Sequence, residues 1–157
     1  MGKLKICIVA SAGGHLQECN KLFPIFSKYD YFYITFAKKD IAKSLKGRVY
    51  IVTNPDIRNP KLGIKAVIKN FFEVLKILIK EKPHVVITSG ASIAIPVCLL
   101  AKILFRTKII FIETISRFYK PSLTGRILYP IADLFFVQWR SLLKKYGKKA
   151  IYGGPLI

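Results

Sequence analysis

Short apolar runs alternate with segments of helical periodicity along the chain, and this alternation limits the possible folds more than any other feature. The apolar runs, rich in β-branched and aromatic residues, are 4–10, 31–36, 49–52, 85–88, 108–112 and 134–137. The helical segments are 16–26, 40–45, 62–82, 92–105 and roughly 122–132. Strands that alternate with helices form parallel sheets covered on both faces. We therefore predict an α/β fold with a doubly wound parallel sheet, in which ligands bind at the carboxyl ends of the strands.

The chain is both strongly basic and apolar. Its 157 residues are enough for one domain, so 1–157 is expected to be a single unit. The 27 Lys and Arg residues against 8 Asp and Glu give a formal charge of +19, while 52% of the residues are hydrophobic. Basic proteins that bind nucleic acid are usually more polar than this. A cationic and apolar surface suits an anionic membrane.

Neither a signal peptide nor a transmembrane helix is predicted. The first apolar stretch is too short for a secretory signal and is interrupted by Ser11 and the glycines. The longest uncharged stretch, 85–101, contains a Thr-Ser-Gly break and Pro96, which favour a strand, a turn and a buried helix. The three cysteines are widely spaced, so we expect no disulfide framework, no metal site and a reducing, cytoplasmic compartment.

Three strand ends carry unusual residues. SAGGH follows the first strand, TSGAS the fourth and ETISR the fifth. In a doubly wound sheet these ends share one edge, so the three loops are expected to line a single cleft.

The SAGGH turn is suited to an anion. Gly13 and Gly14 let the backbone approach a ligand, and the following helix presents free N–H groups and the positive end of its dipole. The alternative is a tight turn that needs glycine for its backbone angles. His15 is a candidate base or hydrogen-bonding group, or a structural residue at the helix start. His84 belongs to the opposite edge of the sheet and is expected to be structural.

The other two turns offer polar and charged groups. Ser89 and Ser92 either cap a helix or, with Gly90, admit a ligand. Glu113 directly ends a buried strand, and Arg117 follows four positions later. We expect Glu113 to receive a sugar hydroxyl or to act in acid–base chemistry, or alternatively to pair with Arg117.

The segment 61–82 carries a lysine stripe beside a broad apolar side. The lysines are Lys61, Lys65, Lys69, Lys76 and Lys80, and the apolar residues include Ile64, Val67, Ile68, Phe71, Phe72, Leu75, Leu78 and Ile79. One part can pack on the sheet while the lysines, Phe71 and Phe72 meet lipid head groups. The alternative is an ordinary core helix with a solvated face.

A complete catalytic apparatus is absent from the sequence. It has no second nucleotide-binding half, no DxD-type metal pair and no obvious nucleophile, base and acid set. If the chain is part of an enzyme, another chain supplies the rest.

Four stretches together resemble one family. They are KICIVASAGGHLQE, SGASIAIP, FIETISRFYKPSLTGRILYPIADLFFVQW and the GG of YGGPLI, and they span almost the whole chain. They resemble the acceptor-side subunits of bipartite UDP-sugar glycosyltransferases, which are the PssD, EpsF and CpsF type proteins of polysaccharide synthesis and the membrane-anchoring subunit of the eukaryotic dolichol-linked N-acetylglucosamine transferase. They are also similar to the N-terminal half of MurG. The resemblance implies a Rossmann-like domain equivalent to the N-terminal half of a GT-B glycosyltransferase.

The resemblance also implies a subunit that is inactive alone. A separate small subunit would bind the UDP-sugar, so this chain would hold no cofactor. It would recruit that partner to the cytoplasmic face of the membrane and present a polyprenyl-diphosphate-linked saccharide. By similarity His15 is the candidate base, and Glu113 matches the acidic residue after the fifth strand. The acceptor-binding candidates are Ser11, Gly13, Gly14, Ser89, Gly90, Ala91, Ser92 and Arg117.

Attachment to the membrane and to the partner follows from the same resemblance. Eukaryotic members begin with a transmembrane helix, whereas this sequence starts at its first strand, so we expect peripheral attachment through 61–82. Family members use their C-terminal tail in partner binding. This implies a docking role for 152–157, namely Tyr152, Gly153, Gly154, Pro155, Leu156 and Ile157, although a disordered stub would look the same.

Two other functions stay open. A regulatory scaffold would enhance a partner transferase without contributing acid–base groups, so it would keep doing so after replacement of His15 and Glu113. Nucleic-acid binding is suggested only by the charge, because no aromatic stacking platform or recognition helix is evident. The donor sugar cannot be read from this chain, since donor selection would belong to the partner.

Overall fold

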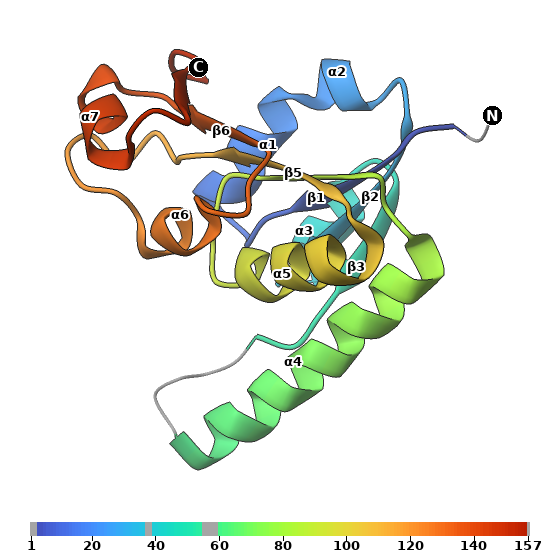
Figure 1. The fold of residues 1–157 in the computed structure, drawn as a ribbon. Coiled ribbons are helices and arrows are strands. Elements are labelled where there is room, and N and C mark those ends of the chain that lie inside the picture. The colour runs from blue at the N-terminus through green and yellow to red at the C-terminus, as the bar shows by residue number, and fades with distance from the viewer. Residues whose placement is uncertain (1–2, 37–38, 55–59, 157) are drawn as a thin grey trace.

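A parallel sheet of seven strands forms the centre of the computed structural model, which describes residues 3–36, 39–54 and 60–156 (Figure 1). The strands are β1 (Lys5–Val9), β2 (Asp30–Thr35), β3 (Arg48–Ile51), β4 (Val85–Thr88), β5 (Lys108–Ile112), β6 (Leu134–Val137) and β7 (Ala150–Tyr152). Their order is β3-β2-β1-β4-β5-β6-β7, and every neighbouring pair is parallel. This confirms the predicted doubly wound sheet. The strand order reverses between β1 and β4, which is where such folds bind ligands.

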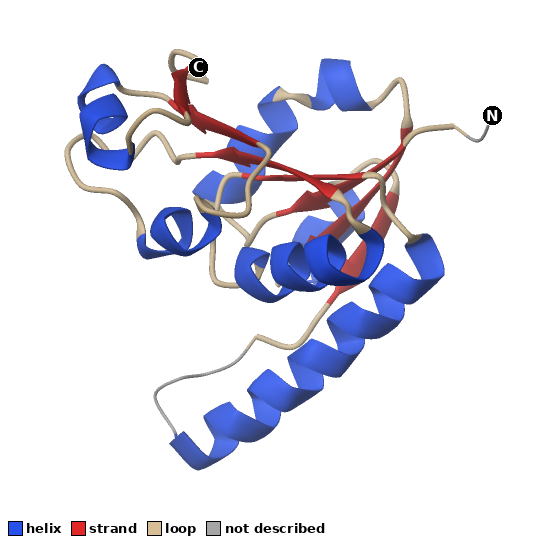
Figure 2. Cartoon of the chain, viewed as in Figure 1, coloured by secondary structure: helices blue, strands red, loops and turns tan. Residues whose placement is uncertain are grey.

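Helices cover the sheet on both faces, as Figure 2 shows. The helices are α1 (Gly14–Lys21), α2 (Phe23–Phe26), α3 (Lys39–Ser44), α4 (Pro60–Glu81), α5 (Ala94–Phe105), α6 (Leu123–Leu128) and α7 (Leu143–Tyr146), with a short 3-10 turn, η1 (Arg140–Leu142). Leu16 of α1 and Phe26 of α2 belong to the core on one face. Leu78 of α4 and Val97 of α5 belong to the core on the other face.

The predicted helix 16–26 is two helices in the structure, and the reason is Pro24. A proline nitrogen cannot donate the helical hydrogen bond to the carbonyl four residues earlier. The chain therefore ends α1 at Lys21 and restarts at Phe23 with the proline in the first turn. The sequence also failed to predict β7, because a three-residue edge strand is too short to show a pattern.

Most acidic side chains are committed to the amino-terminal edge of the sheet or to the interior. Glu81 accepts hydrogen bonds from Lys5 Nζ at 3.0 Å, from Arg48 at 3.4 Å and from the Tyr50 hydroxyl at 2.5 Å. Burial raises the pKa of the Glu81 carboxyl, but these partners outweigh it and the net pKa is lowered. His84 lies at this edge too, where its Nδ1 accepts from the Lys5 amide at 3.0 Å, in line with the expected structural role.

A second ion cluster ties α5 to the sheet. Asp133 contacts Lys102 Nζ at 2.5 Å and Lys108 Nζ at 3.1 Å. Burial opposes ionisation, yet the bonds from Lys102, from the Ile109 amide and from Lys108 lower the pKa of Asp133 to about 2. All six acidic side chains that the structure describes have partners inside the protein. Lysine and arginine therefore dominate the charge of the described surface.

Candidate functional site

The loops after β1, β4 and β5 meet at the carboxyl edge of the sheet, as the sequence predicts. Between the first two loops, His15 Nδ1 lies 3.2 Å from Ser89 Oγ, and the Ser89 hydroxyl donates to the His15 carbonyl oxygen at 3.0 Å. Between the first and third loops, Glu18 of α1 accepts from the Thr114 hydroxyl and the Ile115 amide, both at 2.8 Å. The contact between His15 and Ser89 thus joins the loops that follow β1 and β4, the two strands between which the strand order reverses.

The amino terminus of α1 is open. Gly13 is its N-cap with φ of +95°, so this glycine is required by the backbone. Gly14 lies within the helix, and a Cβ added at either glycine would meet no atom within 4 Å. The first turn holds no acidic residue. The turn alternative therefore explains Gly13, while Gly14 leaves space in front of backbone N–H groups that suit an anion.

Ser89 positions the histidine and does not cap a helix. The N-cap of α5 is Ile93, which offers no side-chain hydrogen bond, so the capping alternative for Ser89 and Ser92 is wrong. Gly90 has φ of +111°, and a Cβ there would lie 3.4 Å from His15 Cε1. This second turn thus packs its backbone closely against the imidazole.

Glu113 is fully buried and its carboxylate serves the loop that follows β5. Its oxygens accept from the Thr114 amide and the Ser122 amide, each at 3.0 Å, and from the Tyr146 hydroxyl. Burial, with the hydrogen bond to Glu113 and its charge, raises the pKa of Tyr146. No ion pair joins Glu113 to Arg117 within the described chain, and the Arg117 side chain is exposed. This geometry gives Glu113 a positioning role, and its participation in acid–base chemistry stays a prediction.

Sequence reasoning missed Glu18. Its carboxylate is buried, and Oε2 has no hydrogen-bond partner in the part of the chain that the structure describes. The available signal was its position three residues after His15, which places both on adjoining turns of one helix. Glu18 therefore attaches the loop after β5 to helix α1.

An aromatic cluster on the same edge was also missed. Phe118 stacks on Trp139 with ring centroids 4.2 Å apart, and Trp139 Nε1 donates to the Ile115 carbonyl at 2.7 Å. Tyr119 beside them is 76% exposed. The cluster joins the third loop to the segment after β6.

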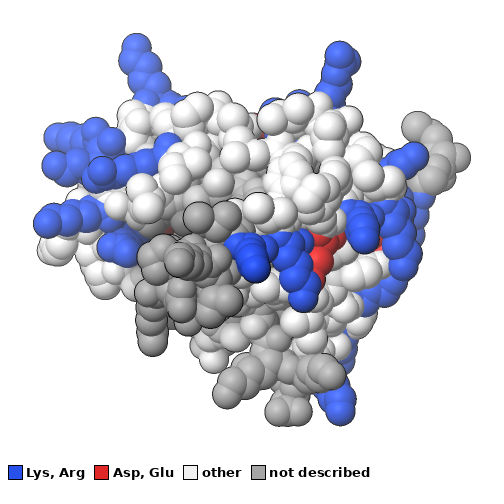
Figure 3. All heavy atoms as spheres, turned by 90° about the horizontal axis from the view of Figure 1, so that it is seen from below, with Lys and Arg blue, Asp and Glu red and all other residues white. Residues whose placement is uncertain are grey.

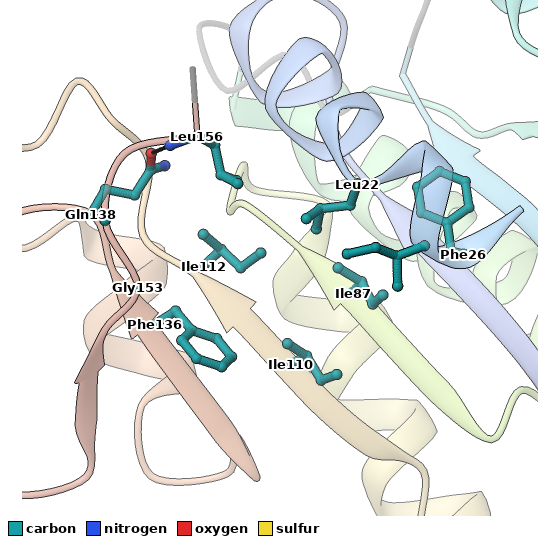
Figure 4. A pocket seen from close by; sticks show the side chains of 11 residues that line it. Leu22, Phe26, Ile87, Ile110, Ile112, Phe136, Gln138, Gly153 and Leu156 are labelled. Carbon is teal, nitrogen blue, oxygen red and sulfur yellow. Dashed lines mark hydrogen bonds between the residues drawn. The ribbon is translucent and has the colours of Figure 1, made fainter.

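The C-terminal tail lines an apolar pocket of about 310 Å³ (Figure 4). Its walls are Leu22, Ile25, Phe26, Ile87, Ile110, Ile112, Phe136, Gln138, Gly153, Gly154 and Leu156. The Leu156 amide donates to Gln138 Oε1 at 2.6 Å, and the Gly153 amide donates to the Val137 carbonyl at 3.1 Å. Tyr152 ends β7, Pro155 lies between these bonds, and Ile157 lies outside the described residues. The described tail is thus attached to the sheet.

Helix α4 presents the predicted lysines beside exposed apolar side chains. Lys65, Lys69, Lys76 and Lys80 are exposed, as are Val67, Ile68, Phe71, Phe72 and Ile79; the side chain of Lys61 lies outside the described part. Seen from the side of α4, blue side chains are spread over an otherwise largely uncharged surface, and red is confined to small patches beside some of them (Figure 3). Within the described residues, no helix is both long and apolar enough to cross a bilayer.

The described residues contain no group of three metal-ligating side chains. Cys7, Cys19 and Cys98 are buried and free, and burial raises the pKa of the Cys19 thiol to about 11. These thiols are apolar core residues.

A family model described as "Oligosaccharide biosynthesis protein Alg14 like" matches residues 57–156, which is well over half of the chain. The chain belongs to the Alg14-like family. Its sequence is 37% identical over 93 residues to the UDP-N-acetylglucosamine transferase subunit ALG14 of Yarrowia lipolytica, covering 56% of this chain and 43% of that one. It is 38% identical over 81 residues to the same subunit of Candida albicans, covering 48% of this chain and 37% of that one. The chain thus spans less than half the length of these two relatives. The Homo sapiens subunit is 25% identical, covering 98% of this chain and 83% of that one.

Solved structures confirm the fold. MurG from Acinetobacter baumannii superposes with a TM-score of 0.75 at 15% identity, covering 97% of this chain and 46% of that one. UDP-N-acetylglucosamine 2-epimerase from Rickettsia bellii superposes with a TM-score of 0.72 at 16% sequence identity, covering 98% of this chain and 45% of that one. The Alg14-like chain therefore has the Rossmann-like fold of the N-terminal half of a GT-B protein.

Gly125→Ala tests whether the Glu113 contacts hold the edge together. A Cβ at Gly125 would lie 2.7 Å from Glu113 Oε2, 2.8 Å from Ser122 Oγ and closer still to the Tyr146 hydroxyl. We expect a loss of about 1–3 kcal/mol in the free energy of unfolding, measured by urea denaturation. Gly14→Ala is the matched control, because its Cβ meets open space and alanine favours the helix. Equal stability of the two variants would contradict this account.

Proposed function

We propose that this Alg14-like chain is the membrane-associated, acceptor-side subunit of a two-component glycosyltransferase. It recruits a small UDP-sugar-binding subunit to the cytoplasmic face of the membrane and presents a lipid-diphosphate-linked saccharide. The relatives are named as UDP-N-acetylglucosamine transferase subunits, so UDP-N-acetylglucosamine is the first donor to test. The narrower resemblance to the PssD, EpsF and CpsF type proteins would place the reaction in polysaccharide synthesis.

The observation that carries the proposal is the open amino terminus of α1 beside His15 at the point where the strand order reverses. Gly14 leaves room for a diphosphate at the positive end of the helix dipole. The first turn of α1 carries no acidic residue that would repel the ligand. Arg117 and Phe118 on the third loop, with Trp139 of the segment after β6 stacked on Phe118, are then available to the diphosphate or the saccharide.

Hydrogen bonding prepares His15 to act as a base. The Ser89 hydroxyl has one hydrogen, and it is donated to the His15 carbonyl oxygen. With the Ser89 hydrogen on that carbonyl, the tautomer that suits the contact between Ser89 Oγ and His15 Nδ1 is the one with its hydrogen on Nδ1. In the neutral imidazole this leaves Nε2 unprotonated, which is the form that removes a proton from an acceptor hydroxyl. That hydroxyl would attack the anomeric carbon of the sugar, and UDP would leave on the partner subunit.

The apolar pocket beneath the tail supports the docking role of 152–157. It exposes the sheet face over β4, β5 and β6 next to residues of the tail (Figure 4). An apolar side chain or helix of the partner would bury this surface, and the edge strand β7 offers unpaired backbone groups beside it.

Reconstitution tests the proposal. Transfer from UDP-N-acetylglucosamine to a polyprenyl-diphosphate saccharide on vesicles is expected to require both this chain and the UDP-sugar-binding subunit. In His15→Ala we expect kcat to fall by about 10²–10⁴, the usual contribution of a general base. The matched control His84→Gln, at the opposite edge, should retain activity.

Three results would contradict the proposal. Full transfer by the partner alone would remove the need for this chain. Unchanged transfer in both His15→Ala and Glu113→Gln would leave only the regulatory scaffold. Salt-sensitive binding to polynucleotide without preference for anionic vesicles would favour the nucleic-acid alternative.

Vesicle binding tests the membrane role of α4. Replacing Lys65, Lys69 and Lys76 by Gln should weaken binding to phosphatidylglycerol vesicles on the order of a hundredfold, since each lysine near an anionic surface contributes about 1 kcal/mol. Cosedimentation at fixed ionic strength measures this. The control replaces Lys144, Lys145 and Lys148, which are also exposed but lie elsewhere. Equal weakening in both triple variants would show that only net charge matters.

A further inference from the structure

An apolar groove of about 540 Å³ runs between α4 and α5. Val67 and Phe71 of α4 form one wall, and Pro96, Leu99 and Ile103 of α5 belong to the other. Its volume is within the range of small-molecule binding sites. The polar Asn70 at its base donates to the Thr53 carbonyl at 2.7 Å, so its amide already has a partner in the protein. The walls therefore favour a hydrocarbon ligand.

The groove reaches the turn after β4, which also contributes residues to the candidate site. Ser92 lines the groove and belongs to the turn after β4. The same turn carries Ser89, which contacts His15, and Gly90, which packs against its ring. A ligand whose polar end occupies the α1 terminus can thus extend its apolar part past Ser92.

The groove also opens on the face proposed to meet the membrane. Val67 is 54% exposed and Phe71 is 41% exposed, so each belongs both to the groove and to the outer surface of α4. Lys65 and Lys69 neighbour them on the same helix. An apolar chain leaving a bilayer at this surface enters a groove that leads to a site for a diphosphate, with lysines beside its entrance.

We propose that this groove holds the isoprene units nearest the diphosphate of the lipid-linked acceptor. The inference rests on the proposed function and assigns the part of the substrate that α4 and α5 recognise. It gives α4 a second task besides membrane attachment, which is to guide the acceptor chain to His15.

Photolabelling tests the groove without the partner subunit. The probe is geranylgeranyl diphosphate carrying a diazirine near its diphosphate end, and mass spectrometry maps the labelled peptides of the full chain. We expect labels within 65–71 and 92–103. Leu99→Trp should lower labelling about tenfold, the effect of withdrawing roughly two buried methylene groups. Val67→Trp fills the groove from the other, exposed wall and provides a second test if the first variant misfolds.

Three controls distinguish binding of the probe in the groove from non-specific hydrophobic binding elsewhere on the surface. Ile68→Trp adds the same side chain to α4 at a position that is 52% exposed and does not line the groove, so labelling should be unchanged. Unlabelled geranylgeranyl diphosphate should compete, and short-chain phosphatidylglycerol should not. Labels in the pocket under the tail, equal loss in all three variants, or equal competition by the phospholipid would overturn the inference.

The outcome is distinguishable from failure of the proposed function. Labelling as expected, with no sugar transfer by the reconstituted pair, would support the prenyl site and contradict the transferase role. The opposite outcome is sugar transfer that persists in Leu99→Trp and Val67→Trp while the groove is not labelled. It would contradict the prenyl site alone.

Discussion

Two buried carboxylates hold the site edge of this protein together. A carboxyl group buried away from water is costly unless hydrogen bonds replace its hydration, so each of the two orders the groups that donate to it. Glu18 binds the loop after β5 to α1, and Glu113 binds the same loop to Ser122 and Tyr146. The third loop is therefore clamped from both sides. The position of Arg117 and of the aromatic pair Phe118 and Trp139 depends on these clamps.

The distribution of charge on the surface follows from the pairing of the few acidic side chains within the protein. The described carboxylates pair with lysines, arginines, hydroxyls or amides of the protein, and three of them, Asp30, Glu81 and Asp133, lie in clusters at the amino-terminal edge. The described surface of α4 carries exposed lysines and apolar side chains, and its one described acidic residue besides Glu81, Glu73, pairs with Lys69 and the Thr53 amide. In the function proposed here, this distribution of charge would suit two anionic ligands, a lipid diphosphate at α1 and a membrane at α4.

The sequence predicted the architecture well because buried parallel strands read as continuous apolar runs. The strands 85–88, 108–112 and 134–137 have the predicted bounds, and the other three differ by one residue at each end. Failures arose where single residues or tertiary contacts decide: Pro24 divides a helix, and β7 is too short to show a period. Within the site, residue spacing located the three loops but could not show that Ser89 bonds to His15 and not to its own helix. Nor could it reveal that Glu113 is enclosed, because hydrogen bonds from Tyr146 and Ser122 come from distant segments.

The central claim is that the glycine-lined terminus of α1 binds a prenyl diphosphate. Titration calorimetry of the isolated chain with geranyl diphosphate, at one fixed salt concentration, tests it most directly, because fixed screening keeps non-specific attraction to a chain of +19 constant. We expect binding that weakens about tenfold in Gly14→Ala, where one methyl group displaces the phosphate from the N–H groups. Identical affinity in the wild-type chain and the variant, or no binding by either, would contradict it.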